Sequence, residues 1–383
     1  MRVNPNIINL ATLAFGVLVY PAIAFAQRAD SAAFIIRLGN DTTSVERYVR
    51  TANQLVVEAV QRSPSTTVHR LVIDYTAANT IGRAVYAVSA PGREQPLVRR
   101  ITEFRGDSAI ITSEQGGQSR VQRVLARNAV PMAGPFYSPY ELAVMRAAAG
   151  SGQKSSVQLL AGTNLVDIPI ERIGRDSVSL TNQFGEPMRA HIDARGRLLH
   201  LNTPAYTTLE RLGWVDLDRL TADFANRDAT GKGMGNLSPR QTNRSTVSGA
   251  NIWIDYSRPG MRGRPIWGAL VPYDRVWRTG ANDAAHFATD KTIEIGGLTL
   301  APGTYTMFLL PTADQWSLIF NKQTGMSGLE RVETQDVGKV ALTKAATNAP
   351  VEWFTIAVEP TTGGGALTFA WDRTRASVPF TVK

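Results

Sequence analysis

The sequence of 383 residues contains no cysteine and only four histidines. Without cysteine, the chain has no disulfide bonds, no thiol nucleophile and no cysteine-bound metal. Two motifs are also absent: His-Glu-Xaa-Xaa-His, typical of zinc proteases, and Gly-Xaa-Ser-Xaa-Gly, typical of α/β-hydrolases. The residues therefore predict no cofactor and no metal site, and they indicate no enzyme class.

Runs of like charge are absent too. The chain carries 41 lysines and arginines against 32 aspartates and glutamates, a net charge of +9, and the two signs are interspersed. Such scatter is typical of a solvated surface, whereas nucleic-acid-binding proteins usually gather basic residues in a stripe. We therefore expect no nucleic-acid partner. The excess of positive charge still allows weak attraction to anionic glycans or envelope surfaces.

A long apolar run occurs near the start of the sequence, over Ile7–Ala24. Arg2 precedes this run, and Ala24-Phe25-Ala26 places small residues at the two positions that a signal peptidase reads. The pattern predicts a signal peptide over 1–26, cleavage near Ala26, and a periplasmic or extracellular protein. An uncleaved membrane anchor is the alternative, although the run is short for a bilayer span. We expect no transmembrane segment after removal of the signal peptide.

The length favours two domains. Residues 27–216 contain short runs of β-branched and apolar residues, separated by turn signals such as Gly39-Asn40-Asp41. Ser138-Pro139 is typical of a helix start, with serine as a cap and proline in the first turn, and this helix continues to Ala149. We expect an N-terminal antiparallel curved sheet with one helix.

Residues 217–246 are rich in Gly, Ser and Asn, which predicts a flexible linker, and a short helix over 209–224 is expected before it. A regulatory cleavage segment is the alternative reading of this stretch. Residues 247–383 then contain about seven to nine short strands, almost without helix, which favours a jelly-roll-like β-sandwich. In one of them, Ile252, Ile254 and Tyr256 recur at every second position and so share a face. The whole protein is predicted to be mainly β.

Three motifs in this C-terminal part occur in a fixed order. They are YSRPGMRGRPIWGALVPYDRVWRTGAND at 256–283, IGGLTLAPGTYTMFLLP at 295–311 and WSLIFNK at 316–322. In this order the motifs resemble the domain of unknown function 2911 family, over about 247–383. The resemblance implies an exported β-domain without assigned chemistry. It does not extend to the N-terminal half.

Arginine and aromatic residues are dense in the first of these motifs. The planar guanidinium of arginine suits a carboxylate, phosphate or sulfate, and aromatic rings offer flat faces with polar tips. We therefore predict a ligand-binding surface, whose members are Tyr256, Arg258, Arg264, Tyr273, Arg278 and Asn282. The alternative is structural: arginines such as Arg258 and Arg278 pair with carboxylates and hold loops in place.

The residues favour an exported, non-catalytic β-protein of the cell envelope, which binds a small anionic or carbohydrate ligand or an envelope protein. The alternative is a hydrolase of envelope or extracellular material, with His286 as acid or base and Asp283 orienting it. A catalytic role requires His286 in a concave pocket beside a polar partner, whereas a binding protein tolerates His286 elsewhere. A purely structural role predicts Arg258 and Arg278 buried against carboxylates.

Overall fold

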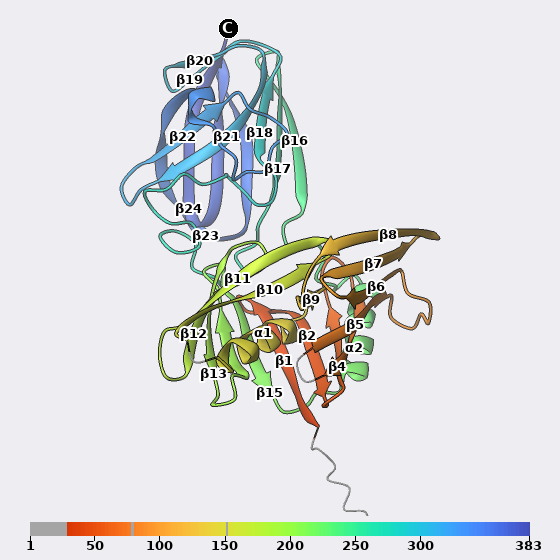
Figure 1. Cartoon of the computed structure of the whole chain (residues 1–383). Helices are drawn as coiled ribbons and strands as arrows, with labels where there is room; N and C mark the ends of the chain where they lie inside the picture. Colours follow the sequence, from red (N-terminus) through yellow and green to blue (C-terminus); the bar gives the residue numbers. More distant parts are fainter. Residues whose placement is uncertain (1–28, 78–79, 151) are drawn as a thin grey trace, which may run out of the picture.

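The computed structural model describes residues 29–77, 80–150 and 152–383. They form two β-rich bodies, each built on its own sheet (Figure 1). The prediction of a mainly β protein with two sheets is confirmed. The predicted signal peptide, 1–26, and its cleavage site lie outside the described residues. Within the described part of the chain, no helix combines the length and the apolar character needed to cross a bilayer.

The N-terminal body is one curved sheet of 15 strands. Its strands are β1 (Asp30–Leu38), β2 (Asp41–Arg50), β3 (Gln54–Gln61), β4 (Thr67–Ala77), β5 (Thr80–Ser89), β6 (Val98–Arg105), β7 (Ser108–Gln115), β8 (Gln118–Leu125), β9 (Val130–Met132), β10 (Lys154–Ala161), β11 (Asn164–Arg172), β12 (Ser177–Thr181), β13 (Pro187–Ile192), β14 (Leu198–Asn202) and β15 (Thr207–Leu212). Two meanders, β1 to β8 and β10 to β15, join where β1 pairs with β15. Among the described pairs of this sheet, β9 with β10 is parallel and the others are antiparallel, so the sheet is mixed rather than purely antiparallel.

Helix α1 (Ser138–Ala148) lies inside the curve of this sheet (Figure 1). It begins where the sequence predicts, with Pro139 in its first turn. All of its residues from Ser138 to Val144 are buried, because they share one apolar core with strands from both meanders. The two ends of the sheet also approach each other, since Ile111 of β7 and Leu160 of β10 pack in one cluster.

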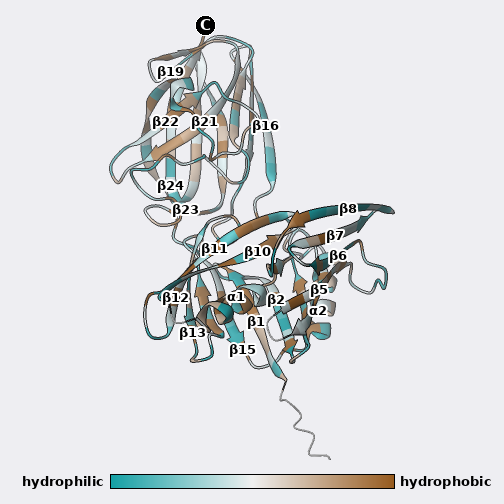
Figure 2. Ribbon diagram, in the orientation of Figure 1, coloured by the Kyte–Doolittle hydropathy of each residue, from teal (hydrophilic) through white to brown (hydrophobic). Residues whose placement is uncertain are grey.

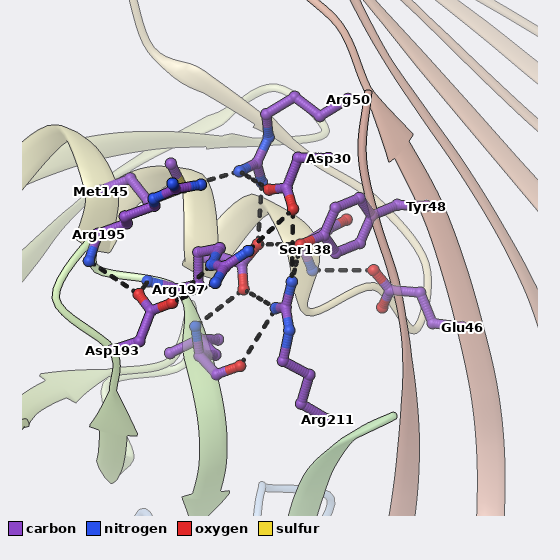
Figure 3. A network of polar contacts seen from close by, with 12 residues as sticks. Asp30, Glu46, Tyr48, Arg50, Ser138, Met145, Asp193, Arg195, Arg197 and Arg211 are labelled. Atoms are coloured by element: carbon purple, nitrogen blue, oxygen red, sulfur yellow. Dashed lines mark hydrogen bonds and ion pairs between the residues drawn. The ribbon is translucent and has the colours of Figure 1, made fainter. Parts of the chain in front are cut away.

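A buried network of charged groups ties α1 to the sheet (Figure 3). Glu141 of α1 is fully buried. Its carboxylate accepts hydrogen bonds from Tyr48 Oη at 2.6 Å, Arg50 Nη2 at 3.0 Å, Arg211 Nη1 at 2.7 Å and the backbone N–H of Leu198 at 2.8 Å. Burying a carboxylate is tolerable only when such partners compensate for the lost water. These contacts join α1 to three strands: Tyr48 and Arg50 belong to β2, Leu198 begins β14 and Arg211 belongs to β15.

Glu46 of β2 caps the start of α1 from outside the helix. Its carboxylate accepts the backbone N–H groups of Tyr137 at 2.6 Å and Ser138 at 2.9 Å, which a helix start leaves without partners. The side chain of Ser138 makes no capping hydrogen bond, in contrast to the sequence prediction. Burial raises the pKa of Glu46 to about 7, although the two N–H groups act in the opposite direction.

Several elements differ from the sequence prediction. β8 is not predicted, because as an exposed edge strand it lacks an alternation of apolar and polar residues. β15 lies where a helix is expected, because it pairs with β1 on one side and β14 on the other. Helix α2 (Leu217–Ala229) starts later, after Asp216, whose side chain accepts the N–H of Arg219. The segment expected as a flexible linker therefore contains α2 and, at its end, a strand.

The C-terminal body is a sheet of nine strands that folds over on itself. Its strands are β16 (Arg240–Val247), β17 (Ala250–Ser257), β18 (Ala285–Thr289), β19 (Ile293–Ile295), β20 (Leu298–Leu300), β21 (Gly303–Pro311), β22 (Trp316–Asn321), β23 (Asp336–Thr361) and β24 (Gly364–Val382), with a 3₁₀ turn at Glu333–Gln335. The first part of β23 pairs with β22 and the rest pairs with β24, so this strand passes from one layer to the other. Ile252, Ile254 and Tyr256 face the core between the layers, as predicted. Hydrophobic and hydrophilic residues alternate along many strands of both bodies (Figure 2).

The turn between β1 and β2 interlocks with a loop of the C-terminal body. Asn40 donates its backbone N–H to the carbonyl of Arg262 at 2.8 Å, and Arg262 also pairs with Asp41. Gly39 has a φ of +58°, and a Cβ there would lie 2.1 Å from the Arg262 carbonyl oxygen. Only glycine fits this backbone approach without displacing the loop. The two bodies therefore meet through close backbone contact at this turn.

Candidate ligand-binding site

A cavity of about 710 Å³ lies where the two bodies meet. Its volume is within the range of small-molecule sites in proteins. The N-terminal body contributes Leu38, Glu186, Pro187, Thr203, Pro204 and Ala205. The C-terminal body contributes most of the remaining wall, including Arg264, Trp277, Arg278, Asn282, Arg331 and Trp371. The cavity therefore depends on both bodies.

Trp277 fixes the segment that carries Arg278. Its backbone exchanges two hydrogen bonds with Leu309 of β21, at 2.7 and 2.9 Å, so this segment continues the sheet beyond β18. The Trp277 ring stacks on Trp371, with ring centroids 5.8 Å apart, and packs against Phe354 at 4.9 Å. These rings belong to the apolar core or pack on it. The packing of Trp277 therefore fixes the position of the backbone at the next residue, Arg278.

The backbone after Arg278 adopts an uncommon conformation. Thr279 is fully buried with a φ of +56°, and Asn282 has the same φ. Such values are rare for residues other than glycine and costly for a β-branched residue. Gly280, at a φ of +149°, lies so close to the carbonyl oxygen of Ser257 that a Cβ would be 2.8 Å from it. Strained backbone of this kind is most frequent at binding and catalytic sites, where contacts with the surrounding structure stabilise it.

The guanidinium of Arg278 has no hydrogen bond or ion pair with any residue that the structure describes. Its apolar stem packs over Gly328, where an added Cβ would lie 2.7 Å from the Cβ of Arg278. Partial burial lowers the pKa of Arg278, and the charge of Glu186 acts in the opposite direction. Arginine nevertheless stays charged in proteins. The cavity wall thus holds a half-buried cation whose hydrogen-bond donors are available to a ligand.

Two further arginines in the wall are already engaged. Arg264 is buried and donates to the carbonyl oxygens of Gly260 at 2.6 Å, Met261 at 3.1 Å and Ala205 at 3.3 Å. Burial lowers the pKa of Arg264. Arg331 pairs with carboxylates outside the cavity lining, those of Glu333 and Asp336. Glu186 is the one carboxylate among the described residues of the lining.

The structure divides the six predicted binding residues into two groups. Arg264, Arg278 and Asn282 line the cavity together. The others do not line it. Tyr256 is fully buried, and its hydroxyl accepts the backbone N–H of Ile356 at 2.9 Å, so it is part of the core. Tyr273 lies outside the lining, with its ring beside Gly268.

Arg258 also lies outside the cavity lining, where it holds β23 in place. It donates to the carbonyl oxygen of Phe354 at 3.1 Å and to Thr355 Oγ1 at 3.0 Å. The structural alternative predicted a carboxylate partner for Arg258 and Arg278. The described residues provide one for neither, and only Arg258 has a structural contact through its guanidinium.

We expect Arg258→Ala to lower the free energy of unfolding by about 1–3 kcal/mol, because it leaves a carbonyl oxygen without its charged donor. Urea unfolding measures this change. Arg275→Ala is the matched control, since Arg275 is exposed on the same stretch of chain, and it should change stability by less than about 0.5 kcal/mol. A loss of ligand affinity without a loss of stability in Arg258→Ala would contradict this structural role.

His286 and Asp283, the predicted catalytic pair, are not among the residues that line the cavity. His286 lies on β18 and is half-buried, and its Nε2 accepts the backbone N–H of Gly325 at 3.3 Å. Burial lowers the pKa of His286, the charge of Arg240 lowers it further, and the charges of Asp255 and Asp283 raise it. The ring is therefore a neutral acceptor at neutral pH, engaged by the backbone. In the described part of the chain, no group of three metal-ligating side chains comes together.

Sequence reasoning missed much of the cavity. Glu186, Phe308, Leu329 and Trp371 belong to the wall but carry no pattern that sets them apart from ordinary turn or core residues. Their role arises only because the two bodies meet at the cavity. One segment of the wall, Arg278–Asn282, could be recognised in the sequence. Its glycine and asparagine indicate a backbone conformation that most residues avoid.

The C-terminal body matches a known family. The model of the family described as "Protein of unknown function (DUF2911)" matches residues 238–380, which confirms the resemblance in the sequence and extends it to β16. The N-terminal half matches no family model. No curated protein matches the chain.

Two solved structures show weak similarity. A DUF1089 family protein from Pseudomonas aeruginosa has 13% identity and a TM-score of 0.30, covering 42% of this chain and 89% of that chain. The polysaccharide lyase Uly1 has 8% identity and a TM-score of 0.14, covering 91% of this chain and 89% of that chain. These scores are too low to support an inference about fold or function.

Proposed function

We propose that this is an exported, non-catalytic binding protein of the cell envelope, which holds a small anionic ligand in the cavity between its two β bodies. Export is supported by the apolar run and small residues of 1–26. Binding is supported by the concave cavity, its mostly apolar wall and its few polar groups, a combination typical of small-molecule sites.

The observation that carries the proposal is the guanidinium of Arg278. It is held on a rigid base, its stem is packed over Gly328, and its donors face no hydrogen-bond or ion-pair partner among the described residues. Removing a cation from water without such a partner costs free energy. A ligand carboxylate or phosphate would compensate for that cost through a charge-assisted pair of hydrogen bonds.

The position of His286 supports binding rather than hydrolysis. A general acid or base must lie within hydrogen-bond reach of the reacting group. His286 is outside the cavity lining, and its Nε2 is occupied by the backbone of Gly325. The cavity therefore serves to hold a ligand rather than to cleave it.

We expect Arg278→Met to weaken binding of a small anion about tenfold to a hundredfold, because it removes the charged donors and keeps an apolar stem over Gly328. Isothermal titration calorimetry with decanoate, benzoate and decyl phosphate measures the effect. The free energy of unfolding should change by less than about 1 kcal/mol, since the guanidinium stabilises no protein contact.

Arg275→Met is the matched control, because it removes the same charge from an exposed position in the same segment. It should leave anion binding unchanged. If none of the three anions binds, or if one binds equally well to Arg278→Met, the proposed function is wrong.

A further inference from the structure

We infer that the ligand of the cavity is a monocarboxylate with an apolar body, an alkyl or aryl acid rather than a phosphate or a sugar. This inference rests on the proposed function and names its ligand class. Three features of the wall distinguish an apolar acid from a phosphate or a sugar as the ligand. They are its apolar residues, the charges that line it, and the hydrogen bonds that its polar groups already make within the protein.

The wall is mainly apolar. The residues that line it include Leu270, Val271, Phe308, Leu329, Trp277 and Trp371, together with several prolines. Leu329 is 78% exposed and Val276 is 41% exposed. A ligand that covers large apolar side chains left in contact with water is bound more tightly, because apolar area is removed from water. The ligand therefore needs an apolar body in addition to its charge.

The charge balance of the cavity fits one negative charge. Arg278 is the cation whose donors are unengaged. The guanidinium of Arg264 is buried against carbonyl oxygens, and the charge of Arg331 is compensated by its own carboxylates. Glu186 lines the same cavity from the N-terminal body, and its charge raises the pKa of Arg278 against the effect of burial. A monoanion adds one favourable pair to this arrangement. A phosphate dianion would meet the same single guanidinium together with stronger repulsion from Glu186.

The polar groups of the wall do not suit a sugar, which needs several hydrogen-bond partners around its ring. The donors of Arg264 are taken by carbonyl oxygens, and those of Arg331 by carboxylates. Of the two hydroxyl residues in the lining, Thr203 accepts the backbone N–H of Thr207 at 3.1 Å, and Ser238 is the other. Asn282 is exposed, lines the cavity and follows Arg278 by four residues, after the strained turn. A carboxylate has two oxygens, which suits the planar guanidinium and one neighbouring amide.

Five probes separate the classes by calorimetry on the full mature chain: decanoate, decyl phosphate, decanol, acetate and maltose. We expect decanoate to bind at least about tenfold more tightly than decanol, which lacks the charge, and acetate to show no measurable binding, because it lacks the apolar body. Decyl phosphate should bind more weakly than decanoate. Maltose should not bind. Arg278→Met should lower the affinity for decanoate to that for decanol.

Glu186→Gln provides a second, independent readout. Asn182 donates to Glu186 Oε2 at 2.8 Å, and glutamine keeps an oxygen that accepts this bond. The substitution removes only the charge, and with it the repulsion of an anionic ligand. We expect the affinity for decyl phosphate to rise more than the affinity for decanoate, so the ratio of the two affinities becomes smaller. Equal changes for both probes would overturn the role of Glu186 in selecting a monoanion.

The outcomes distinguish the two proposals. Tighter binding of decyl phosphate than of decanoate, dependent on Arg278, would overturn the ligand class and leave the proposed function intact. Tighter binding of maltose than of decanoate would overturn both, because maltose carries no charge. Binding of decanoate that Arg278→Met does not change would overturn both. Absence of binding by every probe would also overturn both.

Discussion

Replacement of Glu141 by alanine is expected to lower the free energy of unfolding by about 3–5 kcal/mol, the cost of breaking a buried ion pair from one side. Glu141 is fully buried and accepts hydrogen bonds from Arg50 and Arg211, from the hydroxyl of Tyr48 and from the backbone N–H of Leu198. Without its carboxylate, two guanidinium groups lose their shared acceptor inside the sheet. Urea unfolding followed by circular dichroism measures the change.

The matched control is Glu210→Ala. Glu210 pairs with Arg37 at 3.2 Å, but its side chain is 56% exposed, so the pair is screened by water. Exposed pairs contribute about 0–1 kcal/mol. Glu141→Gln should lie between the two, because glutamine keeps one acceptor oxygen and loses the charge. If Glu141→Ala costs no more than Glu210→Ala, the network around α1 does not stabilise the fold.

The second large effect is a dependence of stability on pH at Glu46. Burial raises the pKa of Glu46 from 4.5 to about 7 in the folded protein, so the folded state holds this proton more tightly than the unfolded state does. The stabilising effect is fully present below pH 4.5 and is lost as the pH rises through about 7. The loss should amount to about 3 kcal/mol, at 1.36 kcal/mol per pKa unit.

Glu46→Gln isolates this effect from the titration of other groups. Glutamine does not titrate and still accepts one of the two N–H groups at the start of α1. The parent should therefore lose stability relative to Glu46→Gln as the pH rises. The difference between their free energies of unfolding should change by about 3 kcal/mol between pH 4.5 and pH 8. A difference that is constant with pH would show that Glu46 is ionised in the fold throughout this range.

Local patterns in the sequence predict the elements whose burial is regular. Ile252 and Ile254 alternate on β17 because one face of that strand packs in the core, and Pro139 places the start of α1. β8 and β15 escape prediction for a different reason. Their pairing partners, rather than their own residues, make them strands.

The candidate site shows the same limit more sharply. Arg258 and Arg278 belong to one motif and look equivalent in the sequence. The partner of Arg258 is the carbonyl of Phe354, 96 residues further along the chain, whereas Arg278 faces a cavity completed by the N-terminal body. Glu141 likewise looks like an ordinary acidic residue in the first turn of a helix, yet the sheet closes around it. Contacts between distant segments decide these roles, and no local pattern encodes them.

The central claim is that a ligand lies between the two bodies with its charged group at Arg278. A crystal structure of the mature chain with a bromine-labelled alkyl carboxylate tests this claim most directly. We predict carboxylate density within hydrogen-bond distance of the Arg278 guanidinium, and anomalous bromine signal beside the apolar wall at Trp277 and Leu329. Density for the ligand elsewhere, such as inside the curve of the N-terminal sheet, with an empty cavity at Arg278, would contradict it.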